Sequence, residues 1–277
     1  MSAIATLEDF DFDVVVQDGD RVEKPVHLLA MMLFWHVAEN RLRELGPDFH
    51  VGANQFVYYS VEQARAVAEE ERQLALFEQG RRPDKPKKTA FRGPDAFLVK
   101  DVPYREREAW IAWEENGRLP DLVLELLSPS TAKADYGEKK RIYQDVFESS
   151  EYFLYEPRGL QVDGYRLLDH AYQRISHSGE GRLWSRELQA ELGVWQGEYE
   201  GREGPWLRLF YSDGRLVLTA EEAAVERAEE ERQAREAAVE RAEQERQARE
   251  AAVERATATE RENARLRTRL AKLEGRD

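Results

Sequence analysis

The chain has 277 residues, enough for one well-buried domain with an appendage or for two small domains. It contains no cysteine, which excludes disulfides, thiolate metal sites and cysteine nucleophiles. Its formal net charge of −14 argues against strong non-specific binding to nucleic acid, but a local basic patch is compatible with it.

No apolar run reaches the roughly 18–20 residues that span a bilayer. The first sixteen residues lack the basic segment followed by an apolar segment that marks a secretory signal. We therefore expect a cytoplasmic protein with no membrane partner.

The first part of the chain predicts two helices on either side of a strand. Residues 26–45 are apolar nearly all round at first and amphipathic afterwards, which indicates a long, partly buried helix. A strand is expected at 55–59 and a second helix at 61–79. A polar loop follows at 80–92, with six Arg or Lys side chains and one acid.

The middle of the chain predicts a sheet with a helix packed on it. Strands are expected at 95–99, 122–127 and 152–156, with a helix at 136–149 between the last two. Further strands are expected within 162–176 and at 206–211 and 215–218. This order predicts an α/β fold, with a mixed central sheet flanked by helices.

The end of the chain differs in composition. Every Trp, Tyr and Phe lies between residues 10 and 211, so the domain is predicted to span 1–218. Within residues 219–277, the stretch 222–256 repeats EAAVERAE-E/Q-ERQAR every 14 residues, and no Gly or Pro occurs before Gly275, which predicts one long charged helix. Its heptads are interrupted by Arg, so a weak homo-oligomerising coiled coil and a free, charge-stabilised helix remain alternatives.

An acid within an apolar strand is the most informative feature for chemistry. Glu125 is flanked by Leu and Val, and a carboxylate there is costly unless it is paired, protonated or metal-bound. Asp121 points to the same strand face, but about 13 Å away along the strand. Asp95 opens a neighbouring strand and can lie closer to Glu125. Two carboxylates from adjacent strands suit a hard cation such as Mg²⁺.

The helix that follows this strand carries a lysine in register with two other polar groups. Asp135, Lys139 and Tyr143 recur at every fourth residue and so share one helical face. A lysine there can reach over the carboxylates to stabilise charge on a phosphate or orient a water molecule. The alternative for Lys139 is a solvated surface side chain.

The segments GPDAFLV, WEENGRLPDLVLELLSPST and EYFLYEP, with the helix motif D..EKK.IYQD, resemble a known family. It is the putative restriction endonuclease family (Uma-type, cyanobacterial-type) of the PD-(D/E)XK nuclease superfamily, and the resemblance covers residues from about 10 to 211. It implies a restriction-endonuclease-like core and hydrolysis of DNA phosphodiester bonds with Mg²⁺ (or Mn²⁺).

The resemblance also implies roles for single residues. Asp95 and Glu125 match the acids that hold the metal and serve catalysis. The superfamily lysine would fall at 127, where this chain has Leu127, so its role moves to Lys139. The auxiliary candidates are Asp121 as an alternative PD aspartate, Glu39 as a helix acid, and Tyr143. The candidates for contacts with DNA phosphates lie in the basic loop: Arg81, Arg82, Lys85, Lys87 and Lys88.

Three functions are compatible with these residues. The first is a Mg²⁺-dependent DNA endonuclease. The second is a catalytically silent nuclease fold that binds nucleic acid or protein and acts through its helical tail, which the net charge and Leu127 favour. The third is an unrelated hydrolase that uses the same carboxylates.

Overall fold

The computed structural model describes residues 12, 14–16, 25–157, 160 and 162–274, without the side chains of 271–274. Most of the N-terminal segment that was considered as a signal sequence lies outside these residues. Contacts divide the chain into two units, Met1–Ala220 and Glu221–Asp277, and each is described by itself.

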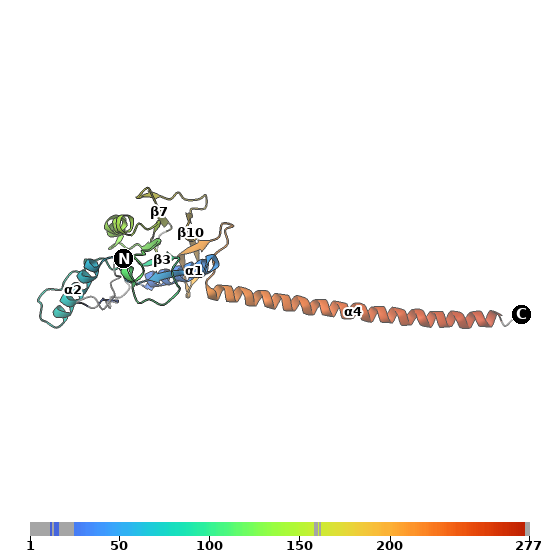
Figure 1. Ribbon diagram of the computed structural model, residues 1–277. Helices are drawn as coiled ribbons and strands as arrows, with labels where there is room; N and C mark the ends of the chain where they lie inside the picture. Colours follow the sequence, from blue (N-terminus) through green and yellow to red (C-terminus); the bar gives the residue numbers. More distant parts are fainter. Residues whose placement is uncertain (1–11, 13, 17–24, 158–159, 161, 275–277) are drawn as a thin grey trace. The chain divides into compact units, whose positions relative to one another are not determined.

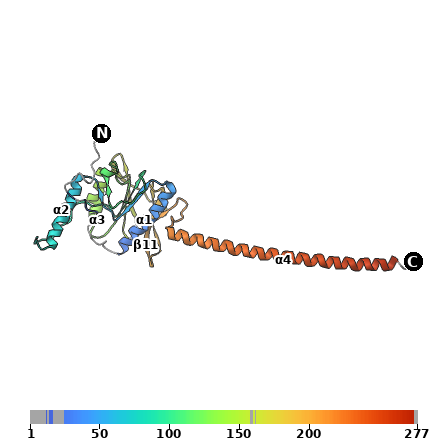
Figure 2. The same cartoon turned by 60° about the horizontal axis from the view of Figure 1, so that its bottom comes forward.

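Figure 1 shows the ribbon of the chain, and Figure 2 shows it from a second direction. The helical elements are α1 (Pro25–Leu45), α2 (Val61–Glu78), the short turn η2 (Ala112–Glu114), α3 (Ala132–Ala134), η3 (Asp135–Lys139), η4 (Ile142–Val146) and α4 (Ala220–Glu274). The strands are β1 (Phe49–Ala53), β2 (Val57–Tyr58), β3 (Ala96–Lys100), β4 (Trp110–Ile111), β5 (Leu122–Leu126), β6 (Glu151–Tyr155), β7 (Val162–Leu168), β8 (Ala171–Arg174), β9 (Leu183–Ser185), β10 (Ala190–Tyr199) and β11 (Arg202–Phe210).

The central sheet has six strands in the order β1-β3-β5-β6-β7-β8. Within it β5 and β6 run parallel and the other neighbours run antiparallel, so the sheet is mixed. A three-stranded sheet of β11, β10 and β9 and the parallel pair of β2 and β4 complete the unit. The predicted α/β class with a mixed central sheet is confirmed.

The two faces of the central sheet bury different cores. Leu122, Leu124 and Leu126 of β5 face a core that contains α1 and side chains of the three-stranded sheet. Val123, which alternates with them, faces a second core with Tyr143. Because alternate residues of a strand point to opposite faces, Glu125 belongs to the second face. The candidate site residues on the strands can therefore be assigned to a face from their positions along the strands.

The segment that covers this second face is an irregular helix, which we call the site helix. It runs through residues 132–146, and most of it is π-helical, in the two stretches η3 and η4. The expected helix at 136–149 is therefore present but begins and ends slightly earlier and is wound more widely. π-Helical turns are rare and occur preferentially at functional sites.

The structure contains strands that the sequence did not predict. β1 has the sequence FHVGA, whose histidine and glycine hide the alternation of a strand. β10 contains Gly193 and Gly197 and has polar residues on one side, so the alternation typical of a strand is weak there too. A Cβ on Gly193 would lie 2.7 Å from the Arg182 side chain, so the missing side chain has a packing reason. β4 and β9 were also not predicted. The strand expected at 215–218 is wrong, because among the described residues Leu216 forms only an isolated bridge with Phe210 there. The other elements lie within a few residues of their predicted bounds.

The second unit is the single helix α4, which has 55 residues. Its valines are exposed, with 65% of Val225, 57% of Val239 and 60% of Val253 open to solvent. Arg232 forms ion pairs with Glu229 and Glu236 along the helix. The long charged helix is confirmed, and the coiled coil stays a prediction.

In the described part of the chain, no helix is long and apolar enough to cross a membrane.

Candidate active site

Strand register brings Asp95 and Glu125 together. β3 pairs antiparallel with β5 so that Ala96 lies opposite Leu124. Continuing this register by one residue places Asp95 opposite Glu125. Directly opposed residues of an antiparallel pair point to the same face of the sheet. Both carboxylates therefore point into the core beneath the site helix.

Glu125 is held by two donors from the site helix. The residue is 1% exposed. The Tyr143 hydroxyl donates to Oε1 of Glu125 at 2.5 Å. Nζ of Lys139 donates to Oε2 at 3.0 Å. Each oxygen of this buried carboxylate thus accepts a hydrogen bond, as burial of a polar group requires.

Asp95 is anchored by the backbone of the neighbouring strand. Its Oδ2 accepts the N–H of Leu126 at 2.6 Å. Burial raises the pKa of the Asp95 carboxyl, and the nearby Lys139 ammonium and hydrogen bonds from Leu126 and Glu125 partly offset that rise. A hydrogen bond between two carboxyls needs a proton, so Asp95 and Glu125 can share one when no cation is present.

Asp135 is a third buried carboxylate in this cluster, and sequence reasoning gave it no role. Nζ of Lys139 lies 2.9 Å from its Oδ1. Its Oδ2 is buried and has no hydrogen-bond partner among the described residues. The sequence spacing could have identified it, since Asp135 is the first residue of the row that continues with Lys139 and Tyr143.

The winding of the site helix keeps this row aligned. In an α-helix a step of four residues turns more than once around the axis, so a third member of the row would drift sideways. The wider π-helical turns rotate less per residue and cancel part of this drift. Lys139 and Tyr143 consequently reach the same carboxylate from successive turns of the helix.

The charges of the cluster are unbalanced. Three buried carboxylates face the single ammonium of Lys139. The pKa of Glu125 is raised to about 8: burial is the main cause, the charges of Asp95 and Asp135 add to the rise, and the Lys139 charge and the Tyr143 hydrogen bond partly offset it. Burial alone would lower the pKa of Lys139, but Glu125, Asp135 and Asp95 raise it above its ordinary value. Lys139 is therefore a permanent cation at neutral pH.

The donor set suits a hard divalent cation. Mg²⁺ prefers oxygen ligands and binds through one or two carboxylates while it keeps several waters. Asp95 and Glu125 supply such a pair, and the excess negative charge and unpartnered Oδ2 of Asp135 favour a cation nearby. Among the described residues, no group of three or more His, Asp or Glu side chains has the geometry of a metal site.

Asp121 lies at the other end of β5. Register places it opposite Val99. Its Oδ2 accepts the N–H of Lys100 at 2.7 Å and lies 3.3 Å from the Arg118 guanidinium. The structure therefore brings Asp95, and not Asp121, to Glu125.

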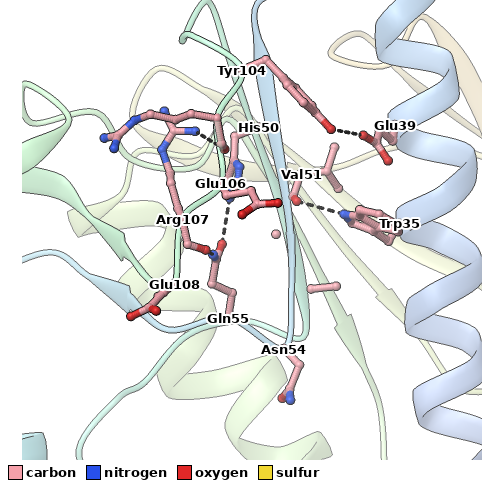
Figure 3. A pocket seen from close by; sticks show the side chains of 13 residues that line it. Trp35, Glu39, His50, Val51, Asn54, Gln55, Tyr104, Glu106, Arg107 and Glu108 are labelled. Carbon is pink, nitrogen blue, oxygen red and sulfur yellow. Dashed lines mark hydrogen bonds between the residues drawn. The ribbon is translucent and has the colours of Figure 1, made fainter. Parts of the chain in front are cut away.

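Glu39 lies on the opposite face of the sheet. It belongs to α1, and it accepts hydrogen bonds from Tyr104 and Arg43, both at 2.8 Å. It lines a pocket of about 650 Å³ beside β1. Figure 3 shows it there with Trp35, whose indole donates to the carbonyl of Val51. Glu39 does not join the carboxylate cluster.

The basic loop divides into paired and open cations. Lys88 lies 3.1 Å from Glu71 of α2, and Arg82 donates to Gln73 of the same helix at 2.7 Å. The exposed members of the loop are Arg81, Lys85 and Lys87, and none of them forms an ion pair with a described carboxylate. These three side chains are the ones open to an anionic partner.

The loop leads directly into the cluster. Phe91, at its end, packs edge-on against Tyr143 with ring centroids 5.8 Å apart. Asp95 follows four residues later. The loop is thus connected to the site through both the chain and the aromatic core.

Comparison with known families identifies the chain. The mixed sheet, with acids on two adjacent strands and a lysine on the following helix, has the arrangement expected for a restriction-endonuclease-like protein. Residues 36–198 match the model of the Uma2 family, described as a putative restriction endonuclease. This match covers more than half of the sequence, and the chain belongs to that family. No curated protein matches the chain.

The free energy of unfolding should decrease as the pH rises, because the pKa of Glu125 is raised in the folded state. Its pKa of about 8 lies above the ordinary 4.5, so between these values the folded chain keeps a proton that the unfolded chain loses. The free energy of unfolding should then fall by up to about 1.4 kcal/mol per pH unit. Glu125→Gln removes this contribution. In urea denaturation with EDTA, the free energy of unfolding of the variant should increase relative to that of the wild type from about pH 5 to about pH 8. A constant difference would contradict the assignment.

Proposed function

We propose that the protein is a Mg²⁺-dependent (or Mn²⁺-dependent) DNA endonuclease that hydrolyses phosphodiester bonds at the cluster of Asp95, Glu125 and Lys139. The observation that supports this most directly is the register that opposes Asp95 and Glu125 beneath Lys139. Membership of the Uma2 family supports the same reaction class.

Each residue has a role that follows from its environment. Asp95 and Glu125 would hold the cation, which when bound would polarise the phosphate and lower the pKa of an attacking water. Lys139 keeps its proton because its pKa is raised, so it acts as a fixed positive charge rather than as a base. It can stabilise the negative charge that develops on the phosphate. Tyr143 orients the Glu125 carboxylate through its hydrogen bond.

The basic loop is the proposed contact for the DNA backbone. Arg81, Lys85 and Lys87 are exposed, and phosphate contacts position a protein on DNA without reading its sequence. Such a local patch offsets the repulsion expected from a chain with a net charge of −14.

A silent nuclease fold is the second candidate. Both oxygens of Glu125 are already satisfied by Lys139 and Tyr143, so the cluster is a consistent structure without metal. Leu127 occupies the position that the resemblance gives to the superfamily lysine. In this case the domain would bind nucleic acid or protein, and the tail would carry the activity.

Cleavage assays separate these candidates. With Mg²⁺ or Mn²⁺, the wild type should cleave plasmid or single-stranded DNA. Glu125→Ala and Lys139→Ala should each lower the rate by about 100-fold or more, because each removes charge stabilisation at the reacting phosphate. Asp121→Asn is the matched control and should retain cleavage, since it lies at the other end of β5. Inactivity of the wild type with both metals, or activity that survives Glu125→Ala, would contradict the proposed mechanism.

Charge reversal tests the loop. The triple variant Arg81→Glu, Lys85→Glu and Lys87→Glu should weaken DNA binding by about tenfold or more at low salt and flatten its salt dependence, because phosphate contacts release counterions. Fluorescence anisotropy across a salt series measures both effects. Arg202→Glu, which changes an exposed arginine of the three-stranded sheet, should leave them unchanged. Equal binding by the triple variant and the wild type would exclude the loop contact.

We propose further that α4 joins two copies of the chain, since an enzyme that cuts both DNA strands benefits from two active sites. The exposed valines repeat every 14 residues, which is two heptads. Sedimentation should then give a larger mass for the full-length protein than for residues 1–218. Monomeric masses for both proteins would reject the association.

A further inference from the structure

Lys139 is shared between two carboxylates that lie on different elements. Nζ lies 3.0 Å from Oε2 of Glu125 on β5 and 2.9 Å from Oδ1 of Asp135 on its own helix. The side chain of Lys139 is 27% exposed, whereas those of both acids are 1% exposed. The ammonium therefore bridges the strand and the helix at the edge of the buried cluster.

A cation on Glu125 would compete with this bridge. The two oxygens of Glu125 are taken by Lys139 and Tyr143. A divalent cation bound there replaces the attraction of the ammonium and repels it. If Lys139 depended on Glu125 alone, metal binding would expel it from the site where its charge is needed.

Asp135 is positioned to hold the Lys139 ammonium in place of Glu125. It precedes Lys139 by four residues, the favourable order for an acid and a base on one helix. Its backbone carbonyl accepts the Tyr152 hydroxyl at 2.9 Å, which ties this turn to β6. Its Oδ2 has no hydrogen-bond partner in the described part of the chain, so the carboxylate has capacity to accept the ammonium fully.

We infer that Asp135 is a positioning residue that retains Lys139 beside the active site when a divalent cation displaces the lysine from Glu125. This inference rests on the proposed metal-dependent function. The handover moves one hydrogen bond of the ammonium from Glu125 to Asp135 and changes no covalent bond. Lys139 would then remain beside the carboxylate pair as a positive charge available to a phosphate.

The reactivity of the lysine amine reports directly on this handover. Reductive methylation of the full-length protein, with and without saturating Mg²⁺, is followed at single lysines by peptide mass spectrometry. Lys133 is exposed on the same helix and provides the internal reference for an unprotected amine. In the wild type, Lys139 should stay protected in both conditions, because one carboxylate always holds it.

Asp135→Asn should change this pattern only when metal is present. Without Mg²⁺, Glu125 still holds Lys139 and labelling stays low. With Mg²⁺, the lysine has lost both partners, and its labelling should rise about tenfold, equivalent to about 1.4 kcal/mol of lost pairing. Labelling that rises with Mg²⁺ in the wild type, or that stays unchanged by Mg²⁺ in the variant, would overturn the inference.

Calorimetric titration with Mg²⁺ distinguishes the positioning role of Asp135 from a role as a metal ligand. It also tests by itself whether the protein binds Mg²⁺, on which the inference depends. Asp135→Asn should weaken Mg²⁺ binding by about tenfold, because the ammonium then competes for Glu125 without an alternative partner. Adding Lys139→Met should restore affinity by removing the competitor. A double variant that stays weak would make Asp135 a ligand and overturn the handover. Failure of the wild type to bind Mg²⁺ would instead reject the metal-dependent function.

Discussion

The desolvation of one carboxylate organises the candidate site. Glu125 is 1% exposed within a strand of leucines and valine, and an uncompensated charge there would oppose folding. The compensation comes from two groups on the site helix, the Lys139 ammonium and the Tyr143 hydroxyl, while the carboxyl of Asp95 on the adjacent strand adds to the negative charge. The pairing of β3 with β5 and the docking of the site helix are therefore linked through this group. A change in either would leave a buried acid without its partners.

The same sheet separates this chemistry from a second polar region. On the face that packs against α1, Glu39 is satisfied by Tyr104 and Arg43 and lines the pocket beside β1 (Figure 3). On the other face, the carboxylate cluster is almost closed to solvent. Two acids that look alike in sequence consequently have different environments, because the sheet lies between them. The pocket walls combine Trp35 and Tyr104 with acids and arginines, and this mixture of charges indicates no single class of ligand.

More of the candidate site than of the strand arrangement could be predicted from the sequence. Glu125 was identified because a carboxylate is conspicuous in an apolar run, and the spacing of Lys139 and Tyr143 predicted a shared face. The choice between Asp95 and Asp121 required the strand register, which depends on long-range pairing that composition does not encode. The face occupied by Glu39 likewise required the fold. β1 and β10 were missed because their glycines and polar residues serve packing that becomes visible only in the assembled sheets.

Because of the π-helical winding, the number of residues in the site helix determines which of its side chains face the carboxylate cluster. Each residue of an α-helix rotates the next by about 100°, so removing one residue from the segment between Asp135 and Tyr143 would turn one of these side chains away from the other. Substitutions in this segment preserve the alignment as long as the helix forms, whereas a deletion destroys it without touching any polar group. Spacing is therefore constrained here independently of residue identity, and a relative with every acid and base in place but a shorter helix would present a different site.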